Sequence, residues 1–281
     1  MRETDQTNPG SARNRGLKFC SGDWIYFADD DVTVEEDFFS NFLRLIRERP
    51  GFDIIGGPNL TPETSTSFQN ANGIALGTTL GSFHCANRYR KSHITENCDD
   101  SMLILCNLFV SRKVVSASPF PENYVCAEEN FALANWRRSG ALCLYSPDLS
   151  VSHARRASPN SFFRQTFKYG RGRGRLVAVG EFHWFHLVPT ICLVVLIALV
   201  LGIFTFGIPW SLPASLLALY FALVTTESLR ISGIRQWRRT VMVMTSIVII
   251  HLGYALGVAR GALRDHPTAE AASSENQRRV A

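Results

Sequence analysis

The chain lacks the cysteine patterns that cross-link a fold or hold a zinc ion. It has 281 residues and seven cysteines, an odd number, and no two of them form a CxxC pair. Disulfide scaffolds and zinc knuckles depend on such pairs, so the sequence argues against both classes and fits a reducing compartment. The first 15 residues lack an apolar stretch, and no secretory signal peptide is therefore recognisable.

Charge is absent from a long stretch of the second half. Residues 187–226 contain no Asp, Glu, Lys or Arg, and a helix needs about 20 apolar residues to cross the hydrocarbon core of a membrane. We expect one span over 187–206, a second over 214–229 and a third over 241–259. A turn that contains glycine and proline separates the first two.

Basic residues predict how these spans are oriented. Four arginines and no acid separate the second and third spans, and an Arg-rich stretch precedes the first. The positive-inside rule places both segments in the cytoplasm. We therefore expect residues 1–180 to form a cytoplasmic domain, 181–260 a multi-pass membrane region and 261–281 a polar, disordered tail. Gly253, Gly257 and Gly261 share a face of the third span and would let a neighbouring helix pack closely.

The first 180 residues alternate between short apolar runs and helical periodicities, which is typical of a layered α/β domain with a largely parallel sheet. Residues 1–16 show no periodicity and predict a loop. Thr33 and Glu36 have the spacing of a capping box, which predicts that a helix starts at Thr33. Further strands are expected over 24–28, 52–55, 102–110, 141–145 and 149–152, and further helices over 69–80 and 128–138.

Three carboxylates, Asp29, Asp30 and Asp31, directly follow the first predicted strand. In open α/β sheets ligands bind beyond the carboxyl ends of the strands. A hard divalent cation, held through one or two carboxylates and a substrate phosphate, relieves the repulsion between such neighbours. The triplet therefore indicates a Mg²⁺ or Mn²⁺ site, and the alternative is a solvated acidic turn.

Other candidate residues each have a functional and a structural interpretation. Glu128 and Glu129 open a predicted helix, where they act as a general base or simply complement the helix dipole. His153 ends a predicted strand, as a metal ligand or a structural hydrogen-bonding residue. Gly57 permits close approach of a ligand or forms a plain turn.

Basic residues and glycines interleave over 163–175, between the domain and the first span. Arginine binds phosphate through two parallel hydrogen bonds, and glycine keeps the backbone accessible to it. Attraction to lipid headgroups is the alternative, and the position next to a membrane span argues against nucleic acid. The candidate residues are Gln165, Lys168, Arg171 and Arg173.

Together these motifs resemble the family 2 glycosyltransferases of bacteria over residues 11–175. The segment 11–16, which contains Arg13, and the run to Asp31 are similar to the approach to the family's DxD metal motif, with Asp29 and Asp31 at the acidic positions. Glu128-Glu129 resembles the family's Glu-Asp pair, in which the second acid is the catalytic base. His153 resembles its strand-end histidine. Residues 165–169 are similar to the QxxRW motif of processive members, with Lys for Arg and Tyr for Trp.

The resemblance implies a GT-A-like, partly Rossmann-like mixed-sheet domain followed by transmembrane helices. It implies an inverting, metal-dependent transfer of a sugar from a nucleotide-diphosphate sugar to a hydroxyl of a polyprenyl-lipid-linked or polysaccharide acceptor at the bacterial inner (plasma) membrane. The implied site comprises a catalytic pair, a Mg²⁺ or Mn²⁺ site and substrate contacts. The catalytic pair is Glu129, as the base, and Glu128. The metal ligands are Asp29, Asp31 and His153. The substrate contacts are Asp29, Asp30, Arg13, Gly57, Gln165, Lys168, Arg171 and Arg173.

The family's nucleotide-binding strands normally precede the segment that contains Arg13. This chain starts near that segment, so we expect a domain truncated at its N-terminus. The alternative function is a non-catalytic remnant, a membrane-bound binding or assembly subunit that lacks the nucleotide half-site.

Overall fold

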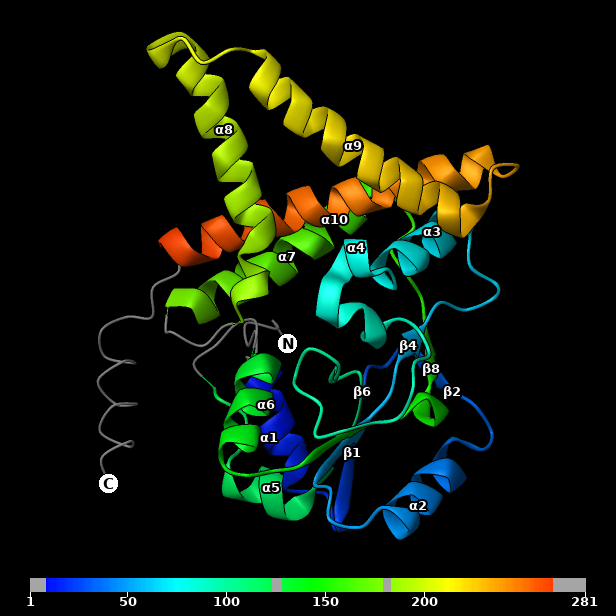
Figure 1. Ribbon diagram of the computed structural model, residues 1–281. Coiled ribbons are helices and arrows are strands. Elements are labelled where there is room, and N and C mark those ends of the chain that lie inside the picture. The colour runs from blue at the N-terminus through cyan, green and yellow to red at the C-terminus, as the bar shows by residue number, and fades with distance from the viewer. Residues whose placement is uncertain (1–8, 123–127, 179–182, 265–281) are drawn as a thin grey trace, which may run out of the picture.

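The computed structural model describes residues 9–122, 128–178 and 183–264. Within these ranges an α/β domain lies at one end of the molecule and long helices lie at the other (Figure 1). The predicted tail lies outside the described residues.

The main sheet has five strands in the order β1-β6-β3-β7-β5. Among these described strands only the β3–β7 pair is parallel. The expected largely parallel sheet is therefore wrong and the expected mixed sheet is right, because an apolar run does not encode the direction of its neighbours. The strands are β1 (Trp24–Ala28), β6 (Asn107–Ser111), β3 (Ile54–Gly56), β7 (Cys143–Tyr145) and β5 (Thr95–Glu96).

A second sheet has three strands, in the order β2-β8-β4. Strand β2 (Val32–Val34) pairs antiparallel with β8 (Val151–His153), and β4 (Asn59–Leu60) pairs parallel with it. Thr33 lies opposite Ser152 in this ladder, so the predicted helix start at Thr33 is wrong. The residues that were expected to cap the helix pair as strand β2 instead, and the helix α2 (Phe38–Glu48) begins only after them.

Helices cover both faces of the main sheet. On one face α2 buries Phe38, Phe42 and Leu45, and the Phe42 ring stacks on Phe109 of β6 with centroids 3.7 Å apart. The other face packs against α5 (Arg112–Ala117) and α6 (Glu128–Arg138), where Trp136 is fully buried.

Residues 9–17 form a helix, α1 (Pro9–Leu17), where the sequence predicted a loop. Its helical propensity is low, but tertiary contacts compensate. The Asn14 side chain donates to the Phe120 carbonyl at 2.8 Å and accepts from the Phe120 amide at 2.9 Å. These bonds fix α1 against the segment that leads towards α6.

The remaining helices connect the domain to the apolar region. They are α3 (Ser67–Leu76), α4 (Thr79–Ser82), α7 (Pro159–Ala178), α8 (Val188–Phe206), α9 (Ser211–Ser232) and α10 (Trp237–Arg264), with short 3-10 turns η1 (Phe83–Arg88), η2 (Pro147–Leu149) and η3 (Trp184–His186).

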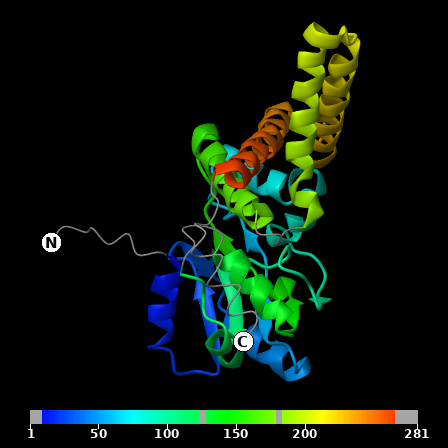
Figure 2. The ribbon, with the colours of Figure 1, turned by 90° about the vertical axis from the view of Figure 1, so that its left-hand side faces the viewer.

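Three of these helices, α8, α9 and α10, are long and apolar enough to cross a membrane. Helices α8 and α9 form a hairpin that projects from the domain, whereas α10 lies across the domain beside α7 (Figure 1 and Figure 2). The buried share of their most apolar windows is 6%, 17% and 44% respectively. The third candidate span therefore differs from the other two because the protein itself covers much of it.

Glycines allow α7 and α10 to pack with their backbones in contact. A Cβ atom on Gly170 or Gly174 of α7 would lie 2.2 Å from a carbonyl oxygen of α10, and a Cβ on Gly257 or Gly261 of α10 would lie 2.2 Å from one of α7. The predicted close packing of the third span is thus found, and its partner is the Arg/Gly stretch. Gly170 and Gly174 of that stretch face α10, where the sequence suggested an exposed phosphate-binding backbone.

Candidate functional site

The ends of three strands meet at one edge of the domain. Ala28, the last residue of β1, pairs with Asn107, the first of β6, so Asp29 and Cys106 extend the same ladder. His153 ends β8. The ligand atoms of Asp29, Cys106 and His153 all lie within 4.8 Å of one another. His153 Nε2 is also 3.0 Å from Asp31 Oδ1, so the structure brings together the three predicted metal residues and adds a cysteine.

The side chain of Asn59 on β4 contacts two members of this cluster. Its Nδ2 donates to Cys106 Sγ at 3.2 Å and lies 3.5 Å from His153 Nδ1. The buried Arg155 donates to Asn59 Oδ1 at 2.7 Å, which fixes the orientation of the amide. Sequence reasoning missed both residues because their roles depend on strand pairing.

Negative charge is in excess at the strand ends. Partial burial raises the pKa of Asp29, with further increases from Asp31 and Asp30, although His153 and Arg13 oppose the shift. Burial likewise raises the pKa of the Cys106 thiol to about 12. Carboxylate and imidazole donors with unbalanced negative charge fit a divalent cation such as Mn²⁺.

The predicted catalytic pair lies at the start of α6. Glu128 is buried and its Oε1 is 2.5 Å from Arg13 Nη1. Burial raises the pKa of Glu129, an effect that Arg88 opposes and Glu128 reinforces. Arg13 and Arg88 are thus close enough to influence Glu129, and Arg13 also influences Asp29. Arg13 therefore influences both predicted acidic groups, the strand-end triplet and the pair at the start of α6.

The other predicted substrate residues are distributed unevenly. Gln165 donates to Tyr169 within α7 at 3.0 Å, and Lys168 and Asp30 are exposed. Gly57 is buried, and a Cβ there would lie 2.3 Å from the Leu149 carbonyl oxygen. Glycine is therefore required at position 57 because the backbone at Leu149 lies so close, and not because a ligand approaches there. Arg171 is half-buried on α7.

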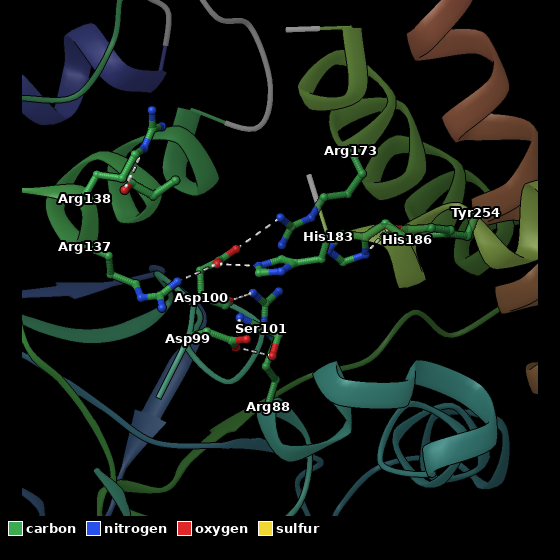
Figure 3. A network of polar contacts seen from close by, with 11 residues as sticks. Arg88, Asp99, Asp100, Ser101, Arg137, Arg138, Arg173, His183, His186 and Tyr254 are labelled. Atoms are coloured by element: carbon green, nitrogen blue, oxygen red, sulfur yellow. Dashed lines mark hydrogen bonds and ion pairs between the residues drawn. The ribbon is translucent and has the colours of Figure 1, made fainter. Parts of the chain in front are cut away.

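The predicted substrate residue Arg173 belongs to a buried network around Asp100 (Figure 3). The Asp100 carboxylate lies 3.3 Å from Arg173 Nη1, 3.4 Å from Arg137 Nη1 and 3.0 Å from His183 Nε2. Arg88 donates to the Asp100 backbone oxygen. The network joins α6, α7 and the segment before α8, and the sequence gave no signal for it because residues 88–100 show only a polar loop.

Comparisons with known proteins agree with this arrangement. Residues 1–114 match the model of the family described as Glycosyl transferase family 2. The minor teichoic acid biosynthesis protein GgaB of Bacillus subtilis (strain 168) is 29% identical over 120 residues, which are 42% of this chain and 12% of that protein. This chain therefore spans only a small part of that relative.

A solved structure extends the likeness to the C-terminal helices. The mannosyltransferase PcManGT from Pyrobaculum calidifontis, in complex with GDP-Man and Mn²⁺, aligns with a TM-score of 0.53 over 94% of this chain and 69% of its own. The identity is 15%, so this match concerns the fold. The chain carries a family 2 glycosyltransferase segment in an α/β fold of the GT-A type. The predicted family and fold class are confirmed.

Proposed function

We propose that this chain transfers a sugar from a nucleotide-diphosphate sugar to a hydroxyl of a lipid-linked or polysaccharide acceptor, with inversion at the anomeric carbon. The observation that carries the proposal is the convergence of Asp29, Asp31 and His153 at strand ends, where Arg13 influences both Asp29 and Glu129. The GDP-Man and Mn²⁺ bound by the structural relative support a nucleotide-sugar donor and a divalent metal.

In this mechanism Asp29, Asp31 and His153 hold the cation. A divalent cation there supplies positive charge to the diphosphate as it leaves the sugar. Glu129 removes the proton of the acceptor hydroxyl while the hydroxyl oxygen attacks the anomeric carbon on the face opposite the diphosphate. The raised pKa of Glu129 suits a base that must hold this proton. Arg13, bound to Glu128, keeps positive charge beside the pair.

A membrane-borne acceptor agrees with the position of the helices. The Asp100 network joins α6, which begins with the catalytic pair, to the segment that enters α8. The similarity to GgaB, a minor teichoic acid biosynthesis protein, supports a polymer or lipid-linked acceptor. We place the domain in the cytoplasm, as the basic flanks of α8 and α9 favour.

We further propose that α8 and α9 cross the membrane while α10 lies at its surface. The glycine contacts hold α10 against α7, so α10 cannot cross without α7. Helix α7 carries five Lys and Arg residues over 164–175, and each would cost about 2.5 to 3.5 kcal/mol at the centre of the bilayer. The predicted third span is in this arrangement a surface helix.

The test of the proposed reaction uses the full chain in membranes, a panel of nucleotide sugars and Mn²⁺. Glu129→Gln is expected to lower turnover about 10²- to 10⁴-fold while donor affinity stays unchanged. Glu48→Gln, at an exposed position on α2, is the control and should leave turnover unaltered. A defect in donor binding alone would contradict the role of Glu129. A wild-type chain that binds no nucleotide sugar saturably would instead support the non-catalytic subunit.

A further inference from the structure

Cys106 differs from the other buried cysteines in its surroundings. Cys98 and Cys143 belong to the apolar cluster between the main sheet and α6. Cys106 is equally buried, with 4% of its surface exposed, but its sulfur accepts a hydrogen bond from Asn59 and lies beside Asp29 and His153. A cysteine that merely fills a core needs none of these polar neighbours.

The backbone explains why the sulfur lies there. Asp29 and Cys106 adjoin the last pair of the β1–β6 ladder, Ala28 and Asn107, so the two strands bring them to the same edge of the sheet. His153 approaches from the end of β8, a strand of the other sheet. Asp29 directly follows β1, Cys106 directly precedes β6 and His153 is the last residue of β8, so three strands of two sheets position the three ligand types.

We infer that Cys106 is a sulfur ligand of the cation that the proposed function places on Asp29, Asp31 and His153. The inference rests on that proposed metal site and adds a residue that the sequence motifs did not include. When the cation binds, the thiol proton passes to solvent and the sulfur forms a bond to the metal.

Distances within the cluster allow this. A ligand atom lies about 2.0 to 2.3 Å from a metal such as Zn²⁺, so neighbouring ligands of a tetrahedral shell are about 3.3 to 3.8 Å apart. The ligand atoms of Asp29, Cys106 and His153 are all within 4.8 Å of one another. A shift of at most about 1 Å in these side chains closes the shell around one ion. Asn59, whose amide is fixed by Arg155, donates to the sulfur and stabilises its negative charge.

A sulfur ligand changes which metals the site prefers. Thiolate favours softer ions, whereas a site of oxygen ligands suits Mg²⁺. We therefore expect Zn²⁺ and Cd²⁺ to bind more tightly than Mg²⁺, and Mn²⁺ to lie between them.

The test is a Cd²⁺ titration of the purified full chain in detergent, followed through the ultraviolet cadmium–thiolate charge-transfer band. The parent for all variants is a chain with Cys20→Ser and Cys192→Ser, which removes two exposed thiols. We expect one saturable band in the parent, at least a tenfold weaker affinity in Cys106→Ser, and an unchanged band in Cys143→Ser. An equal band in Cys106→Ser would overturn the inference.

A second measurement needs no substitution at the site. X-ray absorption at the cadmium edge of the parent should show one sulfur scatterer among the nearest atoms, and a shell of oxygen and nitrogen alone would contradict the inference even if Cys106→Ser failed to fold. In that case a Mn²⁺-induced rise in melting temperature that Asp31→Asn abolishes would leave the proposed function standing. If neither Mn²⁺ nor Cd²⁺ binds, the metal site and the cysteine ligand both fail.

Discussion

The domain contains two acidic regions that are built in opposite ways. Asp100 is buried, and burial alone would raise its pKa, but the hydrogen bond from His183 and the charge of Arg173 together lower that pKa well below its ordinary value. At the strand ends the pKa of Asp29 is raised instead, because burial and the neighbouring carboxylates outweigh His153 and Arg13. An acid with matched cations supports the structure, whereas acids left in excess are suited to bind a cation from solution.

Removing the matched acid should have the largest effect on stability. Asp100→Ala leaves Arg173 buried and unpaired, so we expect the free energy of unfolding to fall by about 3 to 5 kcal/mol. Thermal unfolding in detergent, followed by the fluorescence of the tryptophans, measures it. Asp148→Ala breaks the exposed contact with Arg44 and should cost no more than about 1 kcal/mol. Equal losses in the two variants would show that burial does not distinguish the two ion pairs.

Removing an acid at the strand ends should instead affect turnover more than stability. Asp31→Asn is expected to lower metal-dependent turnover by about 100-fold or more, since even outer partners of a metal site are worth 10- to 100-fold. Its stability without metal should fall by no more than about 1 kcal/mol, because the contact of Asp31 with His153 is largely exposed and a repulsion with Asp29 is relieved. Asp37→Asn is the control, since the Asp37 side chain makes no cap hydrogen bond to α2. Unchanged turnover in Asp31→Asn would remove Asp31 from the metal site.

The sequence located the parts of the site that depend on local pattern. The strand before Asp29, the strand that ends at His153 and the helix that begins at Glu128 all follow from short apolar runs and periodicity. Cys106 and Asn59 could not be found in this way, because only the register of β6 and β4 brings them to the same place.

Partners distant in the chain explain the remaining differences. The fold class was predictable from alternating elements, but strand direction in the main sheet was not. From the sequence alone, the glycines of α7 suggested an accessible backbone. In the structure Gly170 and Gly174 pack against α10, a helix that lies far along the chain. Asp100 gave no signal because its three cationic partners, Arg137, Arg173 and His183, all follow it at long separations.

A smaller effect on stability should follow when the packing of α10 on α7, the helix that carries Arg173, is disturbed without a change in charge. Gly257→Ala places a Cβ 2.2 Å from the Phe167 carbonyl oxygen of α7, and we expect a loss of about 1 to 3 kcal/mol in stability. Gly16→Ala on α1 is the control, because nothing lies within 4 Å of its Cβ and alanine favours the helix by up to about 1 kcal/mol. If both variants gain stability, the close packing of α7 on α10 is not maintained in the membrane-bound protein.

The smallest effect concerns the pH range over which His183 stays protonated beside Asp100. The hydrogen bond to Asp100 raises the pKa of His183 above its ordinary value. The protonated His183 therefore contributes stability that is complete below about pH 6.5 and is lost as the pH rises through the raised pKa. Asp100, with its lowered pKa, contributes stability above about pH 4 that is lost only in stronger acid.

Melting temperatures measured from about pH 5.5 to about pH 8.5 should therefore fall as the pH rises through the upper part of this range. Because the His183 side chain is 35% exposed, solvent screening limits the effect to less than about 1 kcal/mol. His183→Gln keeps a donor to Asp100 but cannot titrate, so its profile should be flatter than that of the wild type. An identical slope in the variant would assign the pH dependence to another group and leave Arg137 and Arg173 as the cations that balance Asp100.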